Sequence, residues 1–405
     1  MKRITAVLIS TLLIGAIVSP ITIPTQAGGF FTAIHPTISG DLVISAVGVN
    51  KLAAFKVGGP NTPVWSIEYK DKNNKIIDRI YASPTAFGDK VFIVVPKDLP
   101  PYRFLTCYEA STGKMIWETP INKGVFGRPM IIDNKVIIGT TGIGVSTGTV
   151  EVYNANDGKF LWQWDWKATP TGWQCDGWVI GNPAYNNGTL FVGSMGAKVV
   201  PIDFKSGKPG KSVWRNVFMC ETLGPSPNPE KLLFDYGPIE GDIVLDVDNL
   251  YFGCMGGVVY CVSAKEGTLV WKSYNKSVHY ARSSPLITNG KVFIGAQKVF
   301  DKGSGLYVLD VKTGSVIGSY KTDDYVNSTP VLYGSNIIFG CDNGIVYCLN
   351  QDLTEVWKSS IGGFISCKPV ISGENVIITS RDSNYGNRIV VLKASSGTKV
   401  WSADK

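Results

Sequence analysis

The stretch "CYEASTGKMIW", residues 107–117, combines features that together indicate one kind of fold. A short apolar segment leads into a polar turn that contains glycine, and a tryptophan follows ten positions after the start. Variants of the same stretch recur as "VYNANDGKFLW" (152–162), "CVSAKEGTLVW" (261–271) and "VLKASSGTKVW" (391–401). Recurrence of one short pattern along the chain is the sequence signature of a repeat architecture.

Looser copies of the stretch extend the repeat over the rest of the chain. They end at Trp65, Trp214 and Trp357, and "VLDVKTGSVIG" (308–318) keeps the turn but has Gly318 where the others have tryptophan. The eight positions are 39 to 57 residues apart. Before each of them come a Pro-containing stretch such as "ARSSPLI", an apolar run such as "KVFIGA" and a third run such as "LYVLD". Four strands per unit at this period are typical of propeller blades.

The sequence therefore predicts an all-β protein, an eight-bladed β-propeller of four-stranded antiparallel blades with docked tryptophans. One such sheet cannot bury its own faces, and a ring of eight buries each face against a neighbour. The expected docking residues are Trp65, Trp117, Trp162, Trp214, Trp271, Trp357 and Trp401. The expected blades span roughly 32–69, 80–121, 125–166, 179–218, 236–274, 281–321, 326–361 and 365–403.

Two features of this ring are open at the level of sequence. The seam beside the sixth blade is expected to be the weakest, unless Tyr320 fills the space that Gly318 leaves. The last strand, "TKVWSA" (398–403), suggests simple end-to-end closure, although residues 28–31 could instead add to the last blade.

The N-terminus resembles a secretory signal in its order of elements. Lys2 and Arg3 precede an apolar run of 15 residues, and small residues precede an expected cut after Ala27. The run is short for a membrane helix, so residues 1–27 are interpreted as a signal peptide and an uncleaved anchor as the alternative. No transmembrane helix is expected in the mature chain. The net charge is +7, but Lys and Arg are scattered, which gives no reason to expect nucleic-acid binding.

With its Thr-Gly turns and following tryptophan, as in "STGKMIW" (111–117) and "KTGSVIG" (312–318), the chain resembles the quinoprotein-like, PQQ-repeat propellers. The resemblance covers roughly residues 32–403 and implies that each outer-strand tryptophan docks against the next blade. In length, blade count and absence of catalytic insertions, the chain is most similar to the BamB-like, non-enzymatic branch. That subunit of the bacterial outer-membrane assembly machine is a lipoprotein scaffold, whereas this chain has no cysteine near the expected cut.

The resemblance implies a secreted, periplasmic or cell-surface module that binds a protein, a peptide or another cell-envelope polymer such as a glycan, without a cofactor and without catalytic residues. The alternative is an alcohol or sugar dehydrogenase that uses pyrroloquinoline quinone (PQQ) with Ca²⁺. Those enzymes are longer and carry a disulfide between adjacent cysteines, which this chain lacks. A carbohydrate-binding propeller is a third possibility because of the tryptophan-rich stretch. With only His35 and His279 and no C-x2-C pair, no metal site is expected.

Two long links between blades, "KATPTGWQCDG" (167–177) and "MCETLGPSPNPEKLLFD" (219–235), are the predicted site of binding. Links from outer to inner strands emerge on one face of a propeller, so these two are expected to form a lip over the channel mouth. The alternative is that they only cover the blade ends. The candidate binding residues are Trp173, Trp178, Asp176, Asp235, Tyr236, His279, Tyr280 and Arg282.

The eight cysteines permit disulfides in a secreted chain. Cys175 and Cys220 lie in the two long links and are the preferred bridge. Two further pairs share the spacing C-x6-C, and each pair is expected on one face of a hairpin, placed diagonally, which is marginal for a bond. These pairs are Cys254 with Cys261 and Cys341 with Cys348. The alternative is that the thiols are free and buried as small apolar groups.

Overall fold

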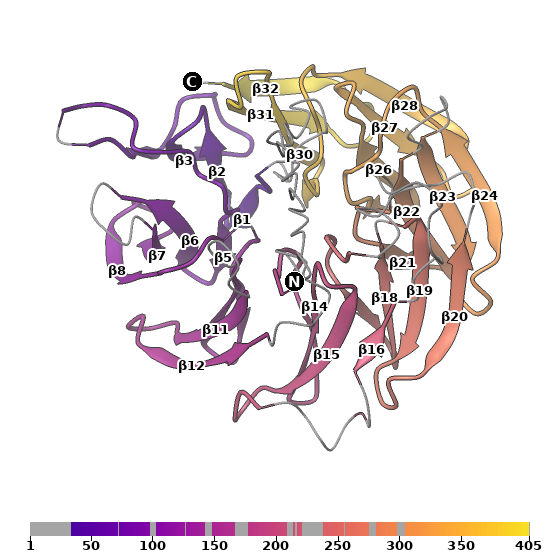
Figure 1. Ribbon diagram of the computed structural model, residues 1–405. Coiled ribbons are helices and arrows are strands. Elements are labelled where there is room, and N and C mark those ends of the chain that lie inside the picture. The colour runs from indigo at the N-terminus through magenta and orange to yellow at the C-terminus, as the bar shows by residue number, and fades with distance from the viewer. Residues whose placement is uncertain are drawn as a thin grey trace, which may run out of the picture. The chain divides into compact units, whose positions relative to one another are not determined.

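The computed structural model describes residues 34–71, 73–97, 103–125, 127–141, 148–166, 177–208, 214, 217–220, 238–254, 256–274, 281–297 and 304–404. All of these residues belong to one compact unit, Thr32–Lys405. They form eight four-stranded sheets, each built from four consecutive antiparallel strands (Figure 1). The predicted eight-bladed, all-β propeller is confirmed. Over the same residues, no helix is long and apolar enough to cross a membrane.

Each blade runs from its inner to its outer strand in chain order. The first four blades are β1 (Thr37–Ser39), β2 (Leu42–Val47), β3 (Lys51–Lys56) and β4 (Trp65–Glu68); β5 (Thr85–Phe87), β6 (Lys90–Pro96), β7 (Arg103–Glu109) and β8 (Met115–Pro120); β9 (Met130–Ile132), β10 (Lys135–Gly139), β11 (Thr149–Asn154) and β12 (Phe160–Asp165); β13 (Ala184–Asn186), β14 (Thr189–Gly193), β15 (Lys198–Asp203) and β16 (Phe218–Met219). The last four are β17 (Val244–Asp246), β18 (Asn249–Gly253), β19 (Val258–Ser263) and β20 (Leu269–Tyr274); β21 (Leu286–Thr288), β22 (Lys291–Ala296), β23 (Gly305–Asp310) and β24 (Val316–Lys321); β25 (Val331–Tyr333), β26 (Asn336–Gly340), β27 (Ile345–Leu349) and β28 (Glu355–Ser360); β29 (Val370–Ser372), β30 (Asn375–Arg381), β31 (Asn387–Lys393) and β32 (Lys399–Ala403).

The core lies between the blades, because the two middle strands of each blade are covered on both faces. All six residues of β2 and all five of β14 are buried, whereas the outer strand β12 alternates exposed and half-buried residues. Strands buried on both faces are continuous apolar runs and do not show a two-residue alternation. Runs such as "KVFIGA" are therefore the middle strands that the sequence predicted.

The first and last blades close the ring by direct contact. The indole Nε1 of Trp401 donates to the carbonyl of Val57 at 3.0 Å, and Gly48 and Asn387 exchange two backbone hydrogen bonds of 2.8 and 2.7 Å. Among the described residues, the last sheet consists of β29–β32. The first and last blades therefore meet directly, while the addition of residues 28–31 to the last blade stays a prediction because these residues lie outside the described ones.

The tryptophan positions form a repeated contact that explains the sequence repeat. Six of the seven indoles pack on the turn glycine of the next blade so tightly that an added Cβ would come within 2.4–2.7 Å of the ring. The pairs are Trp65–Gly113, Trp117–Gly158, Trp162–Gly207, Trp214–Gly267, Trp271–Gly314 and Trp357–Gly397. Six of the seven tryptophans also donate their Nε1–H to a backbone carbonyl of the next blade at 2.9–3.1 Å. Trp162 differs, since no described residue accepts its indole N–H.

The seam between the sixth and seventh blades uses different residues at the same contact. Gly318 stands in the tryptophan position, and Leu353 of the seventh blade approaches to 2.9 Å from the place of its missing Cβ. Leu353 adopts a φ of 63°, as the turn glycines do in the other blades. Tyr320 also packs in this seam and its hydroxyl donates to Glu355 at 2.8 Å. The seam is therefore filled from both sides: by Tyr320, as the sequence allowed, and by Leu353.

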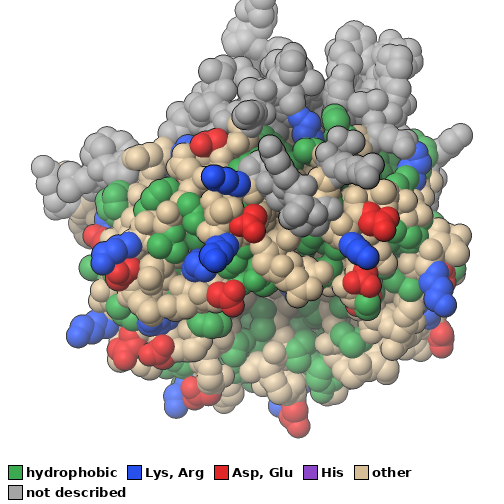
Figure 2. Space-filling model, turned by 90° about the horizontal axis from the view of Figure 1, so that it is seen from below, with side chains coloured by type: hydrophobic (Ala, Val, Ile, Leu, Met, Phe, Trp, Pro, Cys, Tyr) green, Lys and Arg blue, Asp and Glu red, His purple; other side chains and the backbone are tan. Residues whose placement is uncertain are grey.

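On one side of the unit, charged side chains of both signs are mixed. On the side shown in Figure 2, Lys and Arg alternate with Asp and Glu between apolar patches. This mixture agrees with the scattered charges of the sequence.

Candidate binding site at the propeller axis

Each blade brings one residue to the propeller axis immediately before its inner strand. We call these eight residues the axial ring: His35, Ser83, Arg128, Asn182, Asp242, Ser284, Thr329 and Lys368. In seven of the eight blades the next residue is proline. Proline restricts the residue before it to extended conformations, which leads the chain directly into the inner strand.

Hydrogen bonds link the axial ring from blade to blade. In five places the backbone N–H of one ring residue donates to the side chain of the ring residue in the next blade: Lys368 to His35 (2.7 Å), His35 to Ser83 (2.9 Å), Asn182 to Asp242 (2.8 Å), Asp242 to Ser284 (2.9 Å) and Ser284 to Thr329 (3.2 Å). Arg128 and Lys368 have side chains that only donate, so they cannot receive such a bond. The ring is consequently interrupted before both cations.

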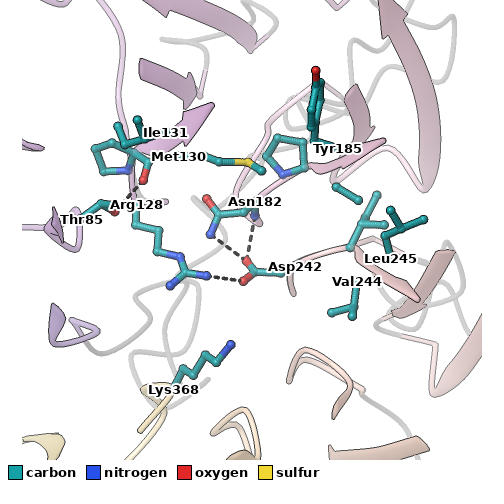
Figure 3. A pocket seen from close by; sticks show the side chains of 14 residues that line it. Thr85, Arg128, Met130, Ile131, Asn182, Tyr185, Asp242, Val244, Leu245 and Lys368 are labelled. Carbon is teal, nitrogen blue, oxygen red and sulfur yellow. Dashed lines mark hydrogen bonds and ion pairs between the residues drawn. The ribbon is translucent and has the colours of Figure 1, made fainter. Parts of the chain in front are cut away.

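The strongest polar contact of the ring is centred on Asp242 (Figure 3). Its carboxylate accepts from Arg128 at 3.1 Å and from the side-chain amide of Asn182 at 3.1 Å. Burial alone would raise the pKa of Asp242, but Arg128 and the backbone N–H of Asn182 hold it below its usual value. Asp242 is therefore ionised at neutral pH and bridges the third, fourth and fifth blades.

His35 acts in the ring as a neutral acceptor. Burial, and then the nearby Arg128 guanidinium, lower its pKa to about 4. Its Nδ1 accepts the Lys368 backbone N–H, which assigns the imidazole proton to Nε2 at neutral pH. This geometry supports a structural histidine and gives it no part in proton transfer.

On the inner-strand side, the ring borders a cavity of about 420 Å³. Its polar end is formed by Arg128, Asn182, Asp242 and Lys368, and Figure 3 shows the Lys368 ammonium pointing toward the Arg128–Asp242 pair. The remaining wall is mostly apolar and is built from the inner strands: Met130, Ile131, Pro183, Ala184, Tyr185, Ile243, Val244 and Leu245. A cavity of this size, with an apolar wall and a few convergent polar groups, is typical of small-ligand sites.

Above the ring, on the side of the links between blades, lie Arg282, which the sequence singled out, and two carboxyl groups that it did not, Glu240 and Asp342. Glu240 pairs with Arg282 at 3.1 Å, and burial raises the pKa of Glu240. Asp342 accepts from the Asn327 amide at 2.7 Å, and burial raises its pKa to about 7. A carboxyl group that titrates near neutrality beside a channel is a recognised mark of a functional site.

Arginine and tyrosine side chains gather on the same face where the first, second and last blades meet. We call this group the arginine–tyrosine cluster: Arg79, Tyr81, Arg103, Arg381 and Tyr385. The guanidinium of Arg79 lies 4.0 Å and that of Arg381 lies 5.1 Å from the centre of the Tyr385 ring. Arg103 lies over Tyr81 at 5.3 Å and pairs with Asp78 at 2.6 Å.

Most of the binding residues predicted from sequence lie outside the described residues: Trp173, Asp176, Asp235, Tyr236, His279 and Tyr280. Two are placed. Arg282 lies at the axis, paired with Glu240. Trp178 is half-buried, its carbonyl accepts from the Met195 N–H at 2.9 Å, and no described residue pairs with its indole N–H. The expected lip over the channel mouth therefore remains a prediction.

Trp164 and Trp166, two and four residues after Trp162, extend the buried seam of the third blade. Trp166 is 4% exposed and its ring meets that of Trp164 edge to face at 4.7 Å. Both belong to the same apolar cluster as Trp162. They are packing residues and are distinct from any ligand platform.

The expectation that each C-x6-C pair shares a face of its hairpin is wrong. Cys261 stands opposite Tyr251, three residues before Cys254, so the two thiols point to opposite faces. Cys254 packs in the seam before its blade and Cys261 in the seam after it. Cys341 and Cys348 are divided in the same way. All four thiols are free, as is that of Cys220, while Cys175 lies outside the described residues.

A metal site is not formed by the described part of the chain, where no three His, Cys, Asp or Glu side chains come together. Asn182, which stands in the Gly-Asn-Pro context of some quinone-dependent enzymes, is engaged with Asp242 through both its backbone and its side-chain amide. The described residues therefore do not fit a Ca²⁺–PQQ site, and we derive no step through that cofactor.

The eight four-stranded blades, seven of them with a docked tryptophan, define an eight-bladed propeller of the PQQ-repeat class. The family model described as "Outer membrane protein assembly factor BamB" matches residues 60–209 and 146–403, and the chain belongs to that family. The BamB of Shewanella oneidensis is 21% identical over 370 residues, covering 87% of this chain and 84% of the relative. A tetrathionate hydrolase of Acidithiobacillus ferrooxidans is 24% identical over 246 residues, covering 53% and 44%.

Among solved structures, BamB from Moraxella catarrhalis superposes with a TM-score of 0.67 at 17% identity, covering 88% of this chain and 95% of that one. A europium-containing methanol dehydrogenase superposes with a TM-score of 0.58 at 13% identity, covering 90% and 82%. At these identities the likeness establishes the fold alone. Since that fold serves both an assembly factor and a dehydrogenase, function has to be argued from the residues.

Proposed function

We propose that this chain is a non-enzymatic binding module of the cell envelope, secreted or held at the cell surface, that docks a protein segment on the face carrying the links between blades. The observation that carries the proposal is membership of the BamB family along residues 60–403. What the relatives' name says of outer-membrane assembly suggests the kind of partner, a protein being assembled or delivered in the envelope.

The charges at the axis support a binding role over a catalytic one. Arg128 is paired with Asp242 and Arg282 with Glu240, so these ions neutralise one another inside the channel. Paired ions hold the blades in a fixed relation, whereas a general acid or base has to face the substrate. The axis thus supplies a rigid frame, and recognition is assigned to the rim.

The arginine–tyrosine cluster has the composition of a binding surface. Arginine and tyrosine are enriched among residues that dominate protein interfaces, because they combine a large apolar area with hydrogen-bonding ends. Tyr385 is 39% exposed although two guanidinium groups flank its ring. The cluster holds three arginines, of which Arg103 pairs with Asp78 and Arg381 lies near Asp342, and this arginine content suits a partner segment that carries acidic side chains.

A capture experiment with matched variants tests the proposal. Tagged mature protein is cross-linked in intact envelopes of the source cells, and partners are quantified by mass spectrometry. The variant Arg79→Ala/Tyr385→Ala should lose the partner, and Trp178→Ala tests the link between the third and fourth blades. Lys312→Ala, in a turn at the opposite ends of the strands, is the control and should recover the partner as the wild type does. Equal recovery by all variants, or loss with Lys312→Ala alone, would refute docking on this face.

The alternative that the sequence left open, a quinone-dependent dehydrogenase, is tested by adding the cofactor. Mature protein is mixed with PQQ and Ca²⁺, and the absorption spectrum and alcohol-linked dye reduction are recorded. The binding proposal expects neither a bound-quinone spectrum nor turnover. A spectrum with turnover that disappears in Asp342→Asn would replace it with the enzymatic function.

A further inference from the structure

Two buried thiols from neighbouring blades lie in contact. The sulfur atoms of Cys220 and Cys254 are 3.3 Å apart. Cys220 follows the outer strand β16 of the fourth blade, and Cys254 follows β18 of the fifth. The two residues are 5% and 1% exposed and share one apolar cluster.

The equivalent two positions also face each other in another seam of the propeller. In the seam between the sixth and seventh blades, Thr322 follows the outer strand and Cys341 follows the second strand, and their side chains are hydrogen-bonded. The backbone contacts match: Cys220 and Thr322 donate their N–H to Ala197 and Ser304, each at 2.9 Å. A disulfide between these two facing positions requires a cysteine at both of them. The seam between the fourth and fifth blades meets this requirement with Cys220 and Cys254.

The backbone holds both cysteines in place. The N–H of Cys254 donates to Val258 at 2.9 Å, and its carbonyl accepts from Gly257 at 3.0 Å and from Ala281 at 3.2 Å. With both residues anchored and their sulfurs already in contact, a bond requires little movement beyond the side chains. The cross-link would also fasten β16, an outer strand of two residues that pairs with β15 at only two positions.

We propose that Cys220 and Cys254 form a disulfide in the mature protein. The two thiols lose two protons and two electrons, and the S–S bond forms as a disulfide oxidant such as glutathione disulfide is reduced to two thiols. The exchange passes through a mixed disulfide on one cysteine, which the thiolate of the other then displaces. Because burial raises the pKa of the Cys254 thiol well above its usual value, the exchange takes place during folding, before the seam closes. The same burial then shields the bond from reductants.

Peptide mapping tests this pairing directly. Unfolded, reduced protein is refolded in a glutathione redox buffer, alkylated under denaturing conditions and digested with trypsin. Cleavage at Lys and Arg places Cys220 in residues 216–231, Cys254 with Cys261 in 232–265, and Cys175 in 168–198. The expected product links 216–231 to 232–265. Chymotryptic cleavage after Tyr260 then separates Cys254 from Cys261 and identifies the bonded thiol.

Variants and a stability readout complete the test. Cys220→Ser and Cys254→Ser should each abolish the linked peptide, while Cys175→Ser and the control Cys261→Ser should retain it. Reduction should lower the Tm of the wild type by about 4 °C and leave that of Cys220→Ser unchanged. Alkylation of both thiols after oxidative refolding would overturn the proposal. A link between 168–198 and 216–231 would overturn it in favour of the Cys175–Cys220 bridge.

Discussion

Replacing Gly158 with alanine tests whether the tryptophan docks hold the blades at close contact. Gly158 lies in the turn of the third blade with a φ of 69°, directly against the indole of Trp117 in the second blade. A Cβ there would lie 2.4 Å from the ring and 2.7 Å from the Thr119 hydroxyl oxygen. Thr119 is already fixed, because it donates to the Gly158 carbonyl at 2.7 Å. Neither neighbour can move without opening the seam.

The expected loss in the free energy of unfolding of Gly158→Ala has two parts, and a matched control variant separates them. A positive φ costs alanine about 1 kcal/mol relative to glycine, and a methyl group forced into a packed contact costs about 1–3 kcal/mol more. Gly88 has nearly the same φ, 61°, but nothing lies within 4 Å of its added Cβ. Gly88→Ala should therefore lower the free energy of unfolding by about 1 kcal/mol, and Gly158→Ala by about 2–4 kcal/mol.

Urea unfolding followed by far-ultraviolet circular dichroism measures both variants against the wild type. Comparable m-values would show that the same cooperative transition is being compared. The difference between the two variants, about 1–3 kcal/mol, is the quantity of interest, since the backbone contribution cancels. Equal destabilisation of both variants would refute the docking argument, because it would mean that the seam yields to a methyl group at no cost.

Three further outcomes follow from the seam and the axis. Asp342→Asn should be more stable than the wild type by about 2–4 kcal/mol at pH 8 and equal to it at pH 3.5, because a carboxyl group whose pKa in the folded protein is about 7 destabilises the fold as pH rises from about 4 to 7. Urea titrations at both pH values measure this difference, and equal stability of the two proteins at pH 8 would contradict the raised pKa. Asp242→Asn should cost about 1–3 kcal/mol in the wild type but less in Arg128→Met, as a double-mutant cycle would show; additive losses would exclude the ion pair. Leu353→Ala should lower the free energy of unfolding by about 1–2 kcal/mol and Trp117→Ala by about 3–5 kcal/mol. Thermal unfolding that shows the larger loss in Leu353→Ala would mean that the seam between the sixth and seventh blades depends on its leucine more than the second blade depends on its tryptophan.

The seams could be predicted from the sequence because they repeat. An indole at one position needs a glycine in the facing turn, and both residues recur in nearly every unit, so the contact is visible as a period. The same reasoning located the exception at Gly318, but it did not identify Leu353 as the residue that packs against it. Leu353 stands where other blades have glycine, and its fit with Gly318 is visible only when the two blades are side by side.

The axial ring could not be predicted because its members do not resemble one another. In seven blades the position before proline was recognisable as the start of an inner strand, but the ring side chain there is imidazole, hydroxyl, guanidinium, amide or ammonium, and in the fifth blade it is a carboxylate followed by isoleucine. Asn182 and Asp242 come from different units, and only closure of the ring shows that they are partners. The predicted placement of the cysteines was wrong for a local reason. A shift of one residue in the strand register moves a thiol to the opposite face of the sheet.

The axial ring combines hydrogen-bond acceptors with two cations. Five of its residues donate their backbone N–H to the side chain of the ring residue in the next blade, and serine, threonine, aspartate and neutral histidine supply these acceptors. Arg128 and Lys368 interrupt the sequence of acceptors, and both of them line the 420 Å³ cavity. The two cations of the ring and the hydrogen-bonded pair Asn182–Asp242 therefore line the same cavity.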